Sequence, residues 1–178
     1  MQPVDLAGIA IDVNTGLPLV VLQERDEPRR VLPIFVGAPE ASAIAIAAAG
    51  ARVPQPLVHD VMAALVAGLD GHVDAVEVNG VSNGVFTAAI RISGPGGSSR
   101  VGSRPSDALA LAVRSGAPVF VSEAVLDAAG HLPDAIEDTT EPTRLDDAEI
   151  DEAVESFRTF LDAVDPADFI DTSATDDD

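Results

Sequence analysis

The order of hydrophobic and polar residues at the start of the chain predicts β structure. Apolar residues dominate the runs VDLAGIAID (4–12) and LPLVVL (17–22), and the polar segment NTG at 14–16 is a typical turn between them. This pair is expected to form a hairpin. After a charged loop at 24–30, the run VLPIFVG (31–37) predicts a third strand.

Two helices are predicted next. The segment 40–49 follows Pro39 and has almost no polar face, so a helix there is expected to be buried on most sides. The segment 57–69 also predicts a helix, because its apolar residues recur at helical spacing: Leu57, Val61, Ala64, Leu65 and Leu69.

Strand patterns return in the second half. Residues 72–81 and 85–92 alternate between apolar and polar side chains, and Asn-Gly at 83–84 is a tight-turn sequence between them. The segment GPGGSS (94–99) lacks the Gly-Lys-Ser/Thr ending of a phosphate-binding loop and separates two strand-like runs. It is therefore expected to be a hairpin loop.

The segment VGSRPSDALALAVR (101–114) predicts a strand followed by a helix, and PVFV (118–121) predicts a short last strand. Strands and helices interleave without a regular βαβ period, and hairpins are frequent. The expected fold class is α+β, with a largely antiparallel curved sheet and packed helices. This domain is expected to span residues 1–132.

The character of the chain changes after His131. Residues 133–147 are rich in Asp, Glu, Thr and Pro and predict an acidic linker. Residues 148–165 predict an amphipathic helix that docks on its own domain or on a partner subunit. Residues 166–178 predict a disordered acidic tail. The helix is predicted from apolar residues at alternating steps of four and three: Ile150, Val154, Phe157, Leu161 and Val164.

Charge is the most unusual property of the composition. The 178 residues are 47% hydrophobic, enough for a core, yet 30 acidic residues face 10 basic ones, for a net charge of -20. No lysine is present. At about 1 M salt the Debye length is only about 3 Å, so the self-repulsion of such a chain largely vanishes. The composition is typical of proteins adapted to molar salt, although an acidic protein of an ordinary cytosol is the alternative.

The composition also excludes several kinds of site. There is no cysteine, which excludes disulfides, thiolate metal sites and cysteine nucleophiles. No apolar run reaches the roughly 20 residues of a membrane span, and the start of the chain does not have the pattern of a signal peptide, so a cytoplasmic protein without membrane contact is expected. Because no basic run is present, any binding of nucleic acid is expected to be weak.

The stretch Arg104-Pro105-Ser106-Asp107 is the first candidate for chemistry. Proline is favoured at the first helical position, and an acid near a helix start can accept backbone hydrogen bonds. Such a cap accounts for Asp107 but not for Arg104, because a cation lies at the wrong end of the helix dipole. Arg104 is therefore expected to have an anionic partner, from the protein or from a ligand.

His59 and Asp60 are the second candidate. Neighbouring helical residues point about 100° apart, so only one of the two is expected to face a given cleft. A single histidine on an apolar helix is more often a packing residue than a base, and both interpretations stay open. His72 and His131 are expected to be solvated turn residues.

Three helix starts associated with proline each carry an acid: Glu40, Asp60 and Asp107. If these starts converge, their oxygens form ligands for Mg²⁺ or Mn²⁺, with Arg104 holding a phosphate. Three separate cap residues would have the same sequence. Metalloprotease, Walker and nucleophile-elbow motifs are absent from the sequence.

Five blocks, in this order, resemble the bifunctional nuclease (DNase/RNase domain) family over roughly residues 1–130: LPIFVGAPEASAIA (32–45), PLVHDVM (56–62), NGVFTAAI (83–90), SRPSDALALAVR (103–114) and PVFVSEAVL (118–126). The resemblance implies hydrolysis of phosphodiester bonds in DNA and RNA, assisted by Mg²⁺ or Mn²⁺, in a compact α+β domain that self-associates.

The resemblance also implies site residues. The family's polar motif residues fall on Glu40, His59, Asp60, Arg104, Ser106, Asp107 and Glu123. Of these, His59, Asp60, Arg104, Ser106 and Asp107 are the expected catalytic residues. The expected metal ligands are Glu40, Asp60, Asp107 and Glu123. In the enzyme hypothesis His59 is the general base and Arg104 stabilises phosphoryl charge. In the alternative, the domain is a non-catalytic oligomeric binding or regulatory module whose charged residues are caps and ion pairs.

The chain departs from the family pattern at three positions. Gly102 takes the place of the first aspartate of the family's Asp-Ala-Arg-Pro-Ser-Asp block. Val58 replaces a threonine before His-Asp, and Thr87 replaces a tyrosine. Loss of a carboxylate and of hydroxyl groups is expected to weaken metal binding or activity.

Overall fold

A computed structural model describes residues 1–51 and 53–132 of the protein. The chain divides into two units, Met1–Pro142 and Thr143–Asp178. The predicted linker at 133–147, the predicted helix at 148–165 and the predicted tail at 166–178 lie outside the described residues.

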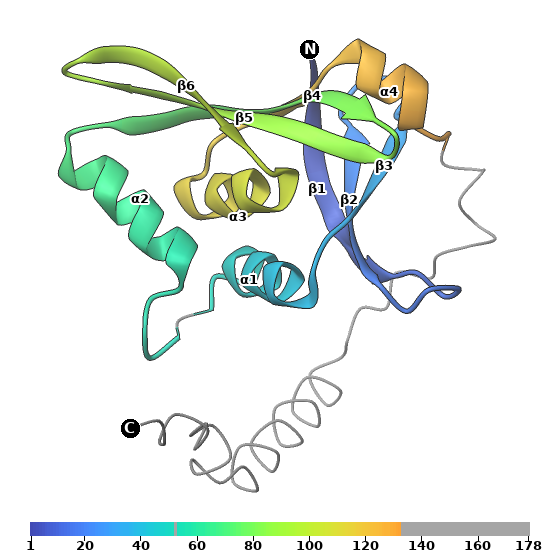
Figure 1. Cartoon of the computed structure of the whole chain (residues 1–178), viewed down its shortest axis with the longest axis horizontal. Helices are drawn as coiled ribbons and strands as arrows, with labels where there is room; N and C mark the ends of the chain where they lie inside the picture. The colour runs from blue at the N-terminus through green and yellow to red at the C-terminus, as the bar shows by residue number, and fades with distance from the viewer. Residues whose placement is uncertain (52, 133–178) are drawn as a thin grey trace, which may run out of the picture. The chain divides into compact units, whose positions relative to one another are not determined.

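The described strands form one seven-stranded sheet in the order β3-β2-β1-β7-β4-β5-β6 (Figure 1). All neighbouring strands are antiparallel except β4 and β7, which are parallel. The mixed α+β fold with a largely antiparallel sheet is thus confirmed. The strands are β1 (Gln2–Ile11), β2 (Pro18–Glu24), β3 (Val31–Phe35), β4 (His72–Ser82), β5 (Val85–Gly94), β6 (Gly97–Ser103) and β7 (Val119–Val121).

The short strand β7 joins the two halves of the sheet. It pairs with β1 from Gln2↔Val121 to Val4↔Val119, and on its other edge with β4 from Val76↔Val119 onwards. Val121 is fully buried there. Because β7 directly follows α3 in the chain, this pairing fixes the helix against the sheet.

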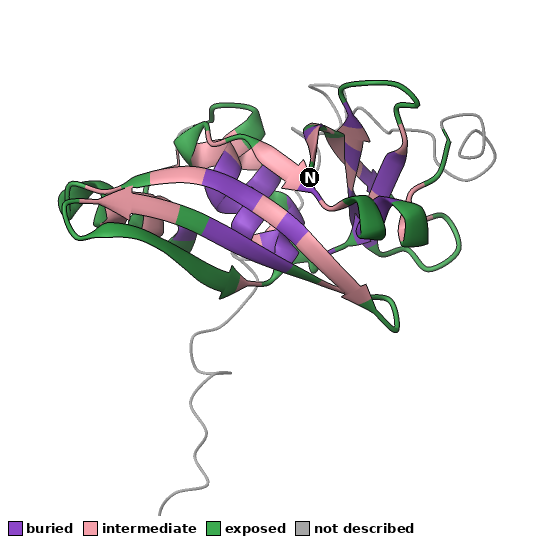
Figure 2. Ribbon diagram, turned by 90° about the horizontal axis from the view of Figure 1, so that it is seen from above, coloured by how far each residue is buried: buried purple, intermediate pink, exposed green. Residues whose placement is uncertain are grey.

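Within residues 1–51 and 53–132, four helices accompany the sheet: α1 (Ala38–Ala48), α2 (Val58–Gly68), α3 (Pro105–Ser115) and α4 (Glu123–Ala129). Figure 1 shows α1 and α3, which contact each other, below the ribbon formed by β4, β5 and β6. The buried residues of β4 and β5 lie in the middle of these strands, over α3, whereas β6 is exposed along most of its length (Figure 2).

Helix α3 is the central element of the core. Pro105 occupies its first turn, and Gly116 ends it in a left-handed conformation at φ 68°, which favours glycine. Its apolar side chains pack on both halves of the sheet, because Leu109 contacts the first core cluster and Leu111 the second. The start of α3 is therefore held firmly in place.

Three details differ from the sequence-based expectations. The loop predicted at 94–99 is shorter, because Ser98 and Ser99 pair within β6 opposite β5. Helix α4 was not predicted, although Ser122 caps it by accepting a hydrogen bond from the Val125 backbone N–H. Helix α1 is buried on one side only, and Ser42 lies on its exposed side.

Helix α2 presents its apolar residues to the outside. Its inner side consists of the buried His59 and the partly buried Met62 and Ala63, which pack beside the second core cluster. Large apolar side chains form a stripe on its outer side, with exposed fractions from 43% to 76%: Val58, Val61, Leu65 and Leu69. We call these four residues the α2 stripe.

Candidate functional site

Arg104 and Asp107 form an ion pair at the start of α3. Arg104 donates from Nε to Asp107 Oδ2 at 2.7 Å and from Nη2 to Asp107 Oδ1 at 2.9 Å. Arg104 itself is the N-cap residue, and no side chain caps this helix. Asp107 therefore binds a neighbouring cation, and Arg104 has the anionic partner that the sequence predicted.

This pairing changes the protonation of both groups. The guanidinium of Arg104 holds the pKa of Asp107 below its ordinary value, against the opposing effect of partial burial, and a contact with His59 lowers this pKa further. The same carboxylate raises the pKa of Arg104. Asp107 is therefore an anion at neutral pH.

Glu40 reaches the same guanidinium from the start of α1. Its Oε1 lies 3.2 Å from Arg104 Nη2. The carboxyl group folds back over Gly37, where a Cβ atom would overlap Glu40 Oε2. The absence of a side chain at Gly37 thus leaves room for this position of Glu40.

His59 joins the group from the start of α2. Its side chain is 5% exposed, and its Nε2 lies 3.4 Å from Asp107 Oδ1. Nδ1 is buried without a hydrogen-bond partner among the described residues. His59 is thus a packed residue, as one interpretation held, and it also contacts the acid of the candidate site.

These four residues line one pocket of about 310 Å³. We call Glu40, His59, Arg104 and Asp107 the Arg104 cluster. Apolar residues of α1 and of the chain around the start of α2 line much of the remainder: Pro39, Ala43, Ile46, Leu57 and Val58. Three helix starts that lie far apart in the sequence thus meet at one hollow.

Asp60 lies outside this pocket. Its Oδ2 accepts a hydrogen bond of 2.7 Å from the Leu57 backbone N–H, and its Oδ1 accepts one of 2.6 Å from Arg114 Nε. This arginine is 6% exposed and lowers the pKa of Asp60. Asp60 caps α2 and binds α2 to α3, and the prediction that only one of His59 and Asp60 faces the cleft is confirmed.

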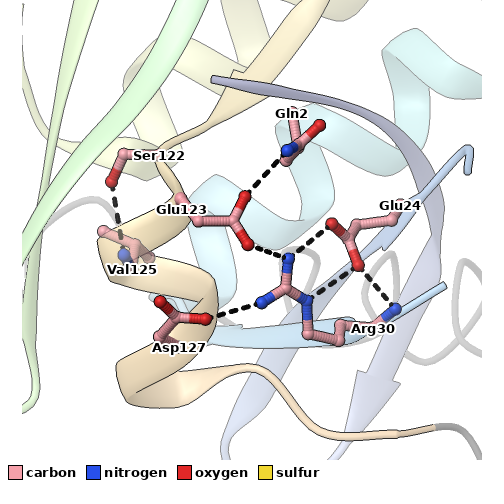
Figure 3. A network of polar contacts seen from close by, with 7 residues as sticks. All are labelled: Gln2, Glu24, Arg30, Ser122, Glu123, Val125 and Asp127. Atoms are coloured by element: carbon pink, nitrogen blue, oxygen red, sulfur yellow. Dashed lines mark hydrogen bonds and ion pairs between the residues drawn. The ribbon is translucent and has the colours of Figure 1, made fainter. Parts of the chain in front are cut away.

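Glu123 belongs to a second group of charges, which Figure 3 shows between α4 and the strands. Arg30 donates to Glu24, to Asp127 at 2.8 Å and to Glu123 at 2.6 Å, and Gln2 also donates to Glu123. We call Arg30, Glu24, Glu123 and Asp127 the Arg30 cluster. None of these residues lines the pocket of the Arg104 cluster.

The remaining sequence-predicted positions are also placed. Ser106 is buried in the first turn of α3, with 8% exposure, and does not line the pocket. His72 and His131 are exposed, and His131 pairs with Val31 in an isolated bridge. The structure thus brings together Glu40, His59, Arg104 and Asp107, but not Asp60 or Glu123.

The described residues do not form a ready-made site for a divalent cation. None of them belong to a group of three or more His, Asp or Glu side chains placed to hold a metal ion. Glu40 and Asp107, the two carboxylates of the pocket, both contact Arg104. Mg²⁺ prefers several oxygen ligands in near-octahedral geometry, which these positions do not supply together.

Comparison with known sequences identifies the family. The profile of the bifunctional nuclease domain matches residues 20–134, more than half of the chain. The chain belongs to the bifunctional nuclease domain family. Its pocket residues Glu40, His59, Arg104 and Asp107 all lie within the matched part.

Two bacterial relatives extend this match to nearly the full length. They are the uncharacterized proteins MT1877 and Rv1829 from two strains of Mycobacterium tuberculosis. Each is 37% identical over 171 residues, which cover 95% of this chain and 98% of the relative. The similarity therefore continues beyond the bifunctional nuclease domain.

Of the three positions that depart from the family pattern, two lie outside the pocket and one lies at its rim. Gly102 pairs with Ala89, which in turn pairs with Glu77 on the next strand. Side chains alternate between the two faces of a sheet, so these three residues lie on the face opposite to Val76 and Ile90, which pack on α3. Thr87 is exposed and donates to Asn79. Neither lines the pocket, so the carboxylate absent at Gly102 does not remove a pocket ligand.

Val58, the third departure, lies at the rim of the pocket and is 65% exposed. Residue-type patterns had not indicated Val58 or Ile46 as site residues, because apolar residues carry no reactive group. Arg114 was also missed, although an arginine at the end of an otherwise apolar helix was a signal for a buried ion pair.

Among the residues that the structure describes, no helix is both long and apolar enough to cross a membrane.

Proposed function

We propose that this bifunctional nuclease domain hydrolyses phosphodiester bonds of DNA and RNA at the pocket of the Arg104 cluster. The observation that supports this proposal most is the convergence of a cation, an ionised acid and a buried histidine on one hollow. The cation binds the phosphate and stabilises its developing charge, the histidine transfers a proton, and the acid positions the histidine.

Arg104 is the group that binds the phosphate. Its side chain is 66% exposed, and its Nη1 has no hydrogen-bond partner among the described residues. A guanidinium binds phosphate oxygens through parallel N–H donors. It also stabilises the negative charge that develops on the phosphoryl oxygens during hydrolysis.

His59 is the proton-transfer group, and Asp107 positions it. Because Asp107 is an anion, it can accept a hydrogen bond from His59 Nε2–H, and in that tautomer Nδ1 is the basic nitrogen of the ring. Histidine is the side chain used most often in general acid–base catalysis. Since Nδ1 is sealed from solvent in this structure, the imidazole must rotate or shift when substrate binds.

Mg²⁺ or Mn²⁺ assistance remains a prediction of the family resemblance. The pocket offers only Glu40 and Asp107 as carboxylate ligands, and Arg104 contacts both. No step of the proposed chemistry is assigned to a metal ion. Activity in a chelator is the direct measurement of this requirement.

The second candidate function is a non-catalytic oligomeric binding or regulatory module. The observation that favours it is that Glu40, Asp60, Asp107 and Glu123 each contact an arginine of the domain. In that case the four acids are structural partners. Substitution of His59 or Asp107 would then leave any nuclease activity of the preparation unchanged.

A nuclease assay on the full chain separates the two functions. We expect the purified protein to cleave DNA and RNA in molar KCl, and we expect Asp107→Asn and His59→Ala to reduce cleavage about 100-fold or more. His72→Ala is the matched control, because His72 is exposed outside the pocket. Equal activity in the wild type and the three variants, with or without a chelator, would indicate a contaminating nuclease. It would refute the proposal that this protein is an enzyme.

We also propose that a second copy of this chain covers Val61, Leu65 and Leu69 of the α2 stripe, while Val58 stays at the rim of the pocket. The only acid within α2 is Asp60, whose charge is balanced by Arg114, so this apolar surface can meet an equally acidic copy without added repulsion. Sedimentation should show an oligomer that Leu65→Glu dissociates and that Val13→Glu, in the first hairpin turn, does not. A monomeric wild-type protein would refute this partner.

We further propose adaptation to molar salt. With a net charge of -20, self-repulsion decreases as salt shortens the Debye length from about 10 Å at 0.1 M to about 3 Å at 1 M. The temperature of unfolding is therefore expected to rise between these two KCl concentrations. An unchanged or lower temperature would contradict this adaptation.

A further inference from the structure

The pocket of the Arg104 cluster has two chemically different parts. Arg104, Asp107 and Glu40 supply charge, whereas Ile46, Leu57 and Val58 belong to an apolar part contributed by α1 and the start of α2. A phosphate group alone would use only the charged part. The apolar part indicates a ligand that carries a flat or apolar moiety next to its phosphate.

The size of the pocket limits this ligand. Its volume of about 310 Å³ lies at the lower end of the range of about 300 to 1,000 Å³ for small-molecule sites. One nucleotide has about this size. A double helix, whose major groove alone is about 12 Å wide, remains outside such a hollow.

The charge of the pocket limits how a duplex can bind. Among the described residues, Arg104 is the only arginine or lysine that lines it. Proteins that hold duplexes without base contacts neutralise several phosphates with arginine and lysine. A single guanidinium in a chain of net charge -20 provides little of this affinity.

We infer that the pocket accepts one unpaired nucleotide, with its phosphate on Arg104 and its base against Ile46, Leu57 and Val58, so that the substrate class is single-stranded nucleic acid. This inference rests on the proposed function, which identifies the phosphate. A paired base would first have to leave the helix, at the cost of its stacking and pairing. An unpaired base avoids most of that cost.

Binding and cleavage of matched probes test the inference. The probes are a short single-stranded DNA, its duplex, and the same single strand with abasic sites in place of its bases. We expect the full chain to bind the single strand about tenfold more tightly than either other probe. The reason is that contact of one base with the apolar part of the pocket, and not attraction to many phosphates, provides most of the binding free energy. The slope of log affinity against log salt is expected to be about −0.7, the value for one phosphate contact on a single strand.

A pair of valine variants locates the base. Val58→Ala is expected to weaken single-strand binding several-fold without changing duplex binding, because Val58 lines the pocket. Val85→Ala is the control and should bind as the wild type does, because Val85 is 67% exposed and lies outside both the pocket and the α2 stripe. Circular dichroism confirms that both variants are folded.

The outcomes separate this inference from the proposed function. Equal binding of the intact and abasic strands, or binding of the duplex as tight as that of the single strand, would refute the nucleotide pocket even if Asp107→Asn abolished cleavage. If the protein binds the intact strand most tightly but shows no cleavage that depends on Asp107, the nuclease function is refuted and the nucleotide pocket is retained. Cleavage of single strands ahead of duplexes supports both.

Discussion

The Arg104 cluster and the Arg30 cluster use the same residue types in opposite ways. Arg30 is 15% exposed and donates to three carboxylates, of which Glu24 is 5% exposed (Figure 3). Arg104 is 66% exposed and contacts two carboxylates at a pocket. The donors of the first arginine are shared among three carboxylates, whereas Nη1 of the second has no hydrogen-bond partner among the described residues.

The surroundings explain the difference. Arg30 lies between the end of β2 and the start of β3, and its hydrogen bonds to Glu24, Glu123 and Asp127 connect these strands to α4. Arg104 stands at a helix start, where the positive end of the helix dipole disfavours it. A cation at this unfavourable position, beside a pocket and a buried histidine, supports the proposed role of Arg104 in phosphate binding.

The largest expected effect separates the two arginines by activity. Arg104→Ala should reduce phosphodiester cleavage about 10²- to 10³-fold, because it removes a donor aimed at the transferring group. Arg30→Ala should leave the rate of the folded protein within about threefold. Cleavage assays below the unfolding temperature of each variant make this comparison. Equal losses in both variants would abolish the distinction between the clusters.

Stability should show the reverse order. Arg30→Ala leaves the buried Glu24 without its cation and is expected to lower the free energy of unfolding by about 3 kcal/mol. Arg25→Ala is the control, since its pair with Asp5 is exposed and contributes about 0.5 kcal/mol. Arg104→Ala should resemble Arg25→Ala. Denaturant titration measures all three, and a loss at Arg104 as large as at Arg30 would contradict the open character of the Arg104 cluster.

Acid should weaken the two clusters unequally. Arg30 lowers the pKa values of Glu24 and Glu123, whereas Arg104 lowers that of Asp107. Because the folded pKa values are depressed, their stabilisation is complete above the unfolded values of about 4 and disappears as pH falls through the folded values.

The free energy of unfolding, measured from about pH 6 down to about pH 3, should therefore fall less steeply in Arg30→Ala than in the wild type. The slope of Arg104→Ala should lie between them. Parallel curves for Arg30→Ala and the wild type would show that Arg30 does not control these acids.

The smallest expected effect concerns Glu40. Gly37→Ala introduces a Cβ where the Glu40 carboxyl lies, so this flexible side chain should move away from Arg104. Stability should change by under about 0.5 kcal/mol, and the affinity of Arg104 for inorganic phosphate should rise about twofold as a competing anion leaves. Gly8→Ala is the control, because nothing lies within 4 Å of a Cβ there. A lower phosphate affinity in Gly37→Ala would mean that Glu40 assists binding.

Local patterns predicted most of the elements. Alternation and turn residues indicated the hairpins of β1 with β2 and of β4 with β5, and proline followed by apolar residues indicated α1 and α3. Helix α4 was not predicted because it has only seven residues, too few to show a helical period of apolar residues. The exposure of the α2 stripe was also not predicted. Helical spacing shows that apolar residues share one face of a helix, but not whether that face is buried.

The candidate site shows the same limit of prediction from local sequence patterns. Glu40, Asp60 and Asp107 are all acids in the first turn of a helix, and nothing local distinguishes them. Asp60 caps its helix and binds Arg114, whereas Glu40 and Asp107 turn to Arg104. Their partners come from distant segments, as Arg114 does for Asp60.

The sequence by itself determined the strands, the main helices, the family and the residue types available for chemistry, because these follow from neighbours along the chain. Only the tertiary structure decided that Glu40, His59, Arg104 and Asp107 share a pocket and that Asp60 and Glu123 do not. The reason is physical: ion pairs and pockets depend on distances of a few ångströms between segments, and these are set by how β7 and α3 pack against the sheet.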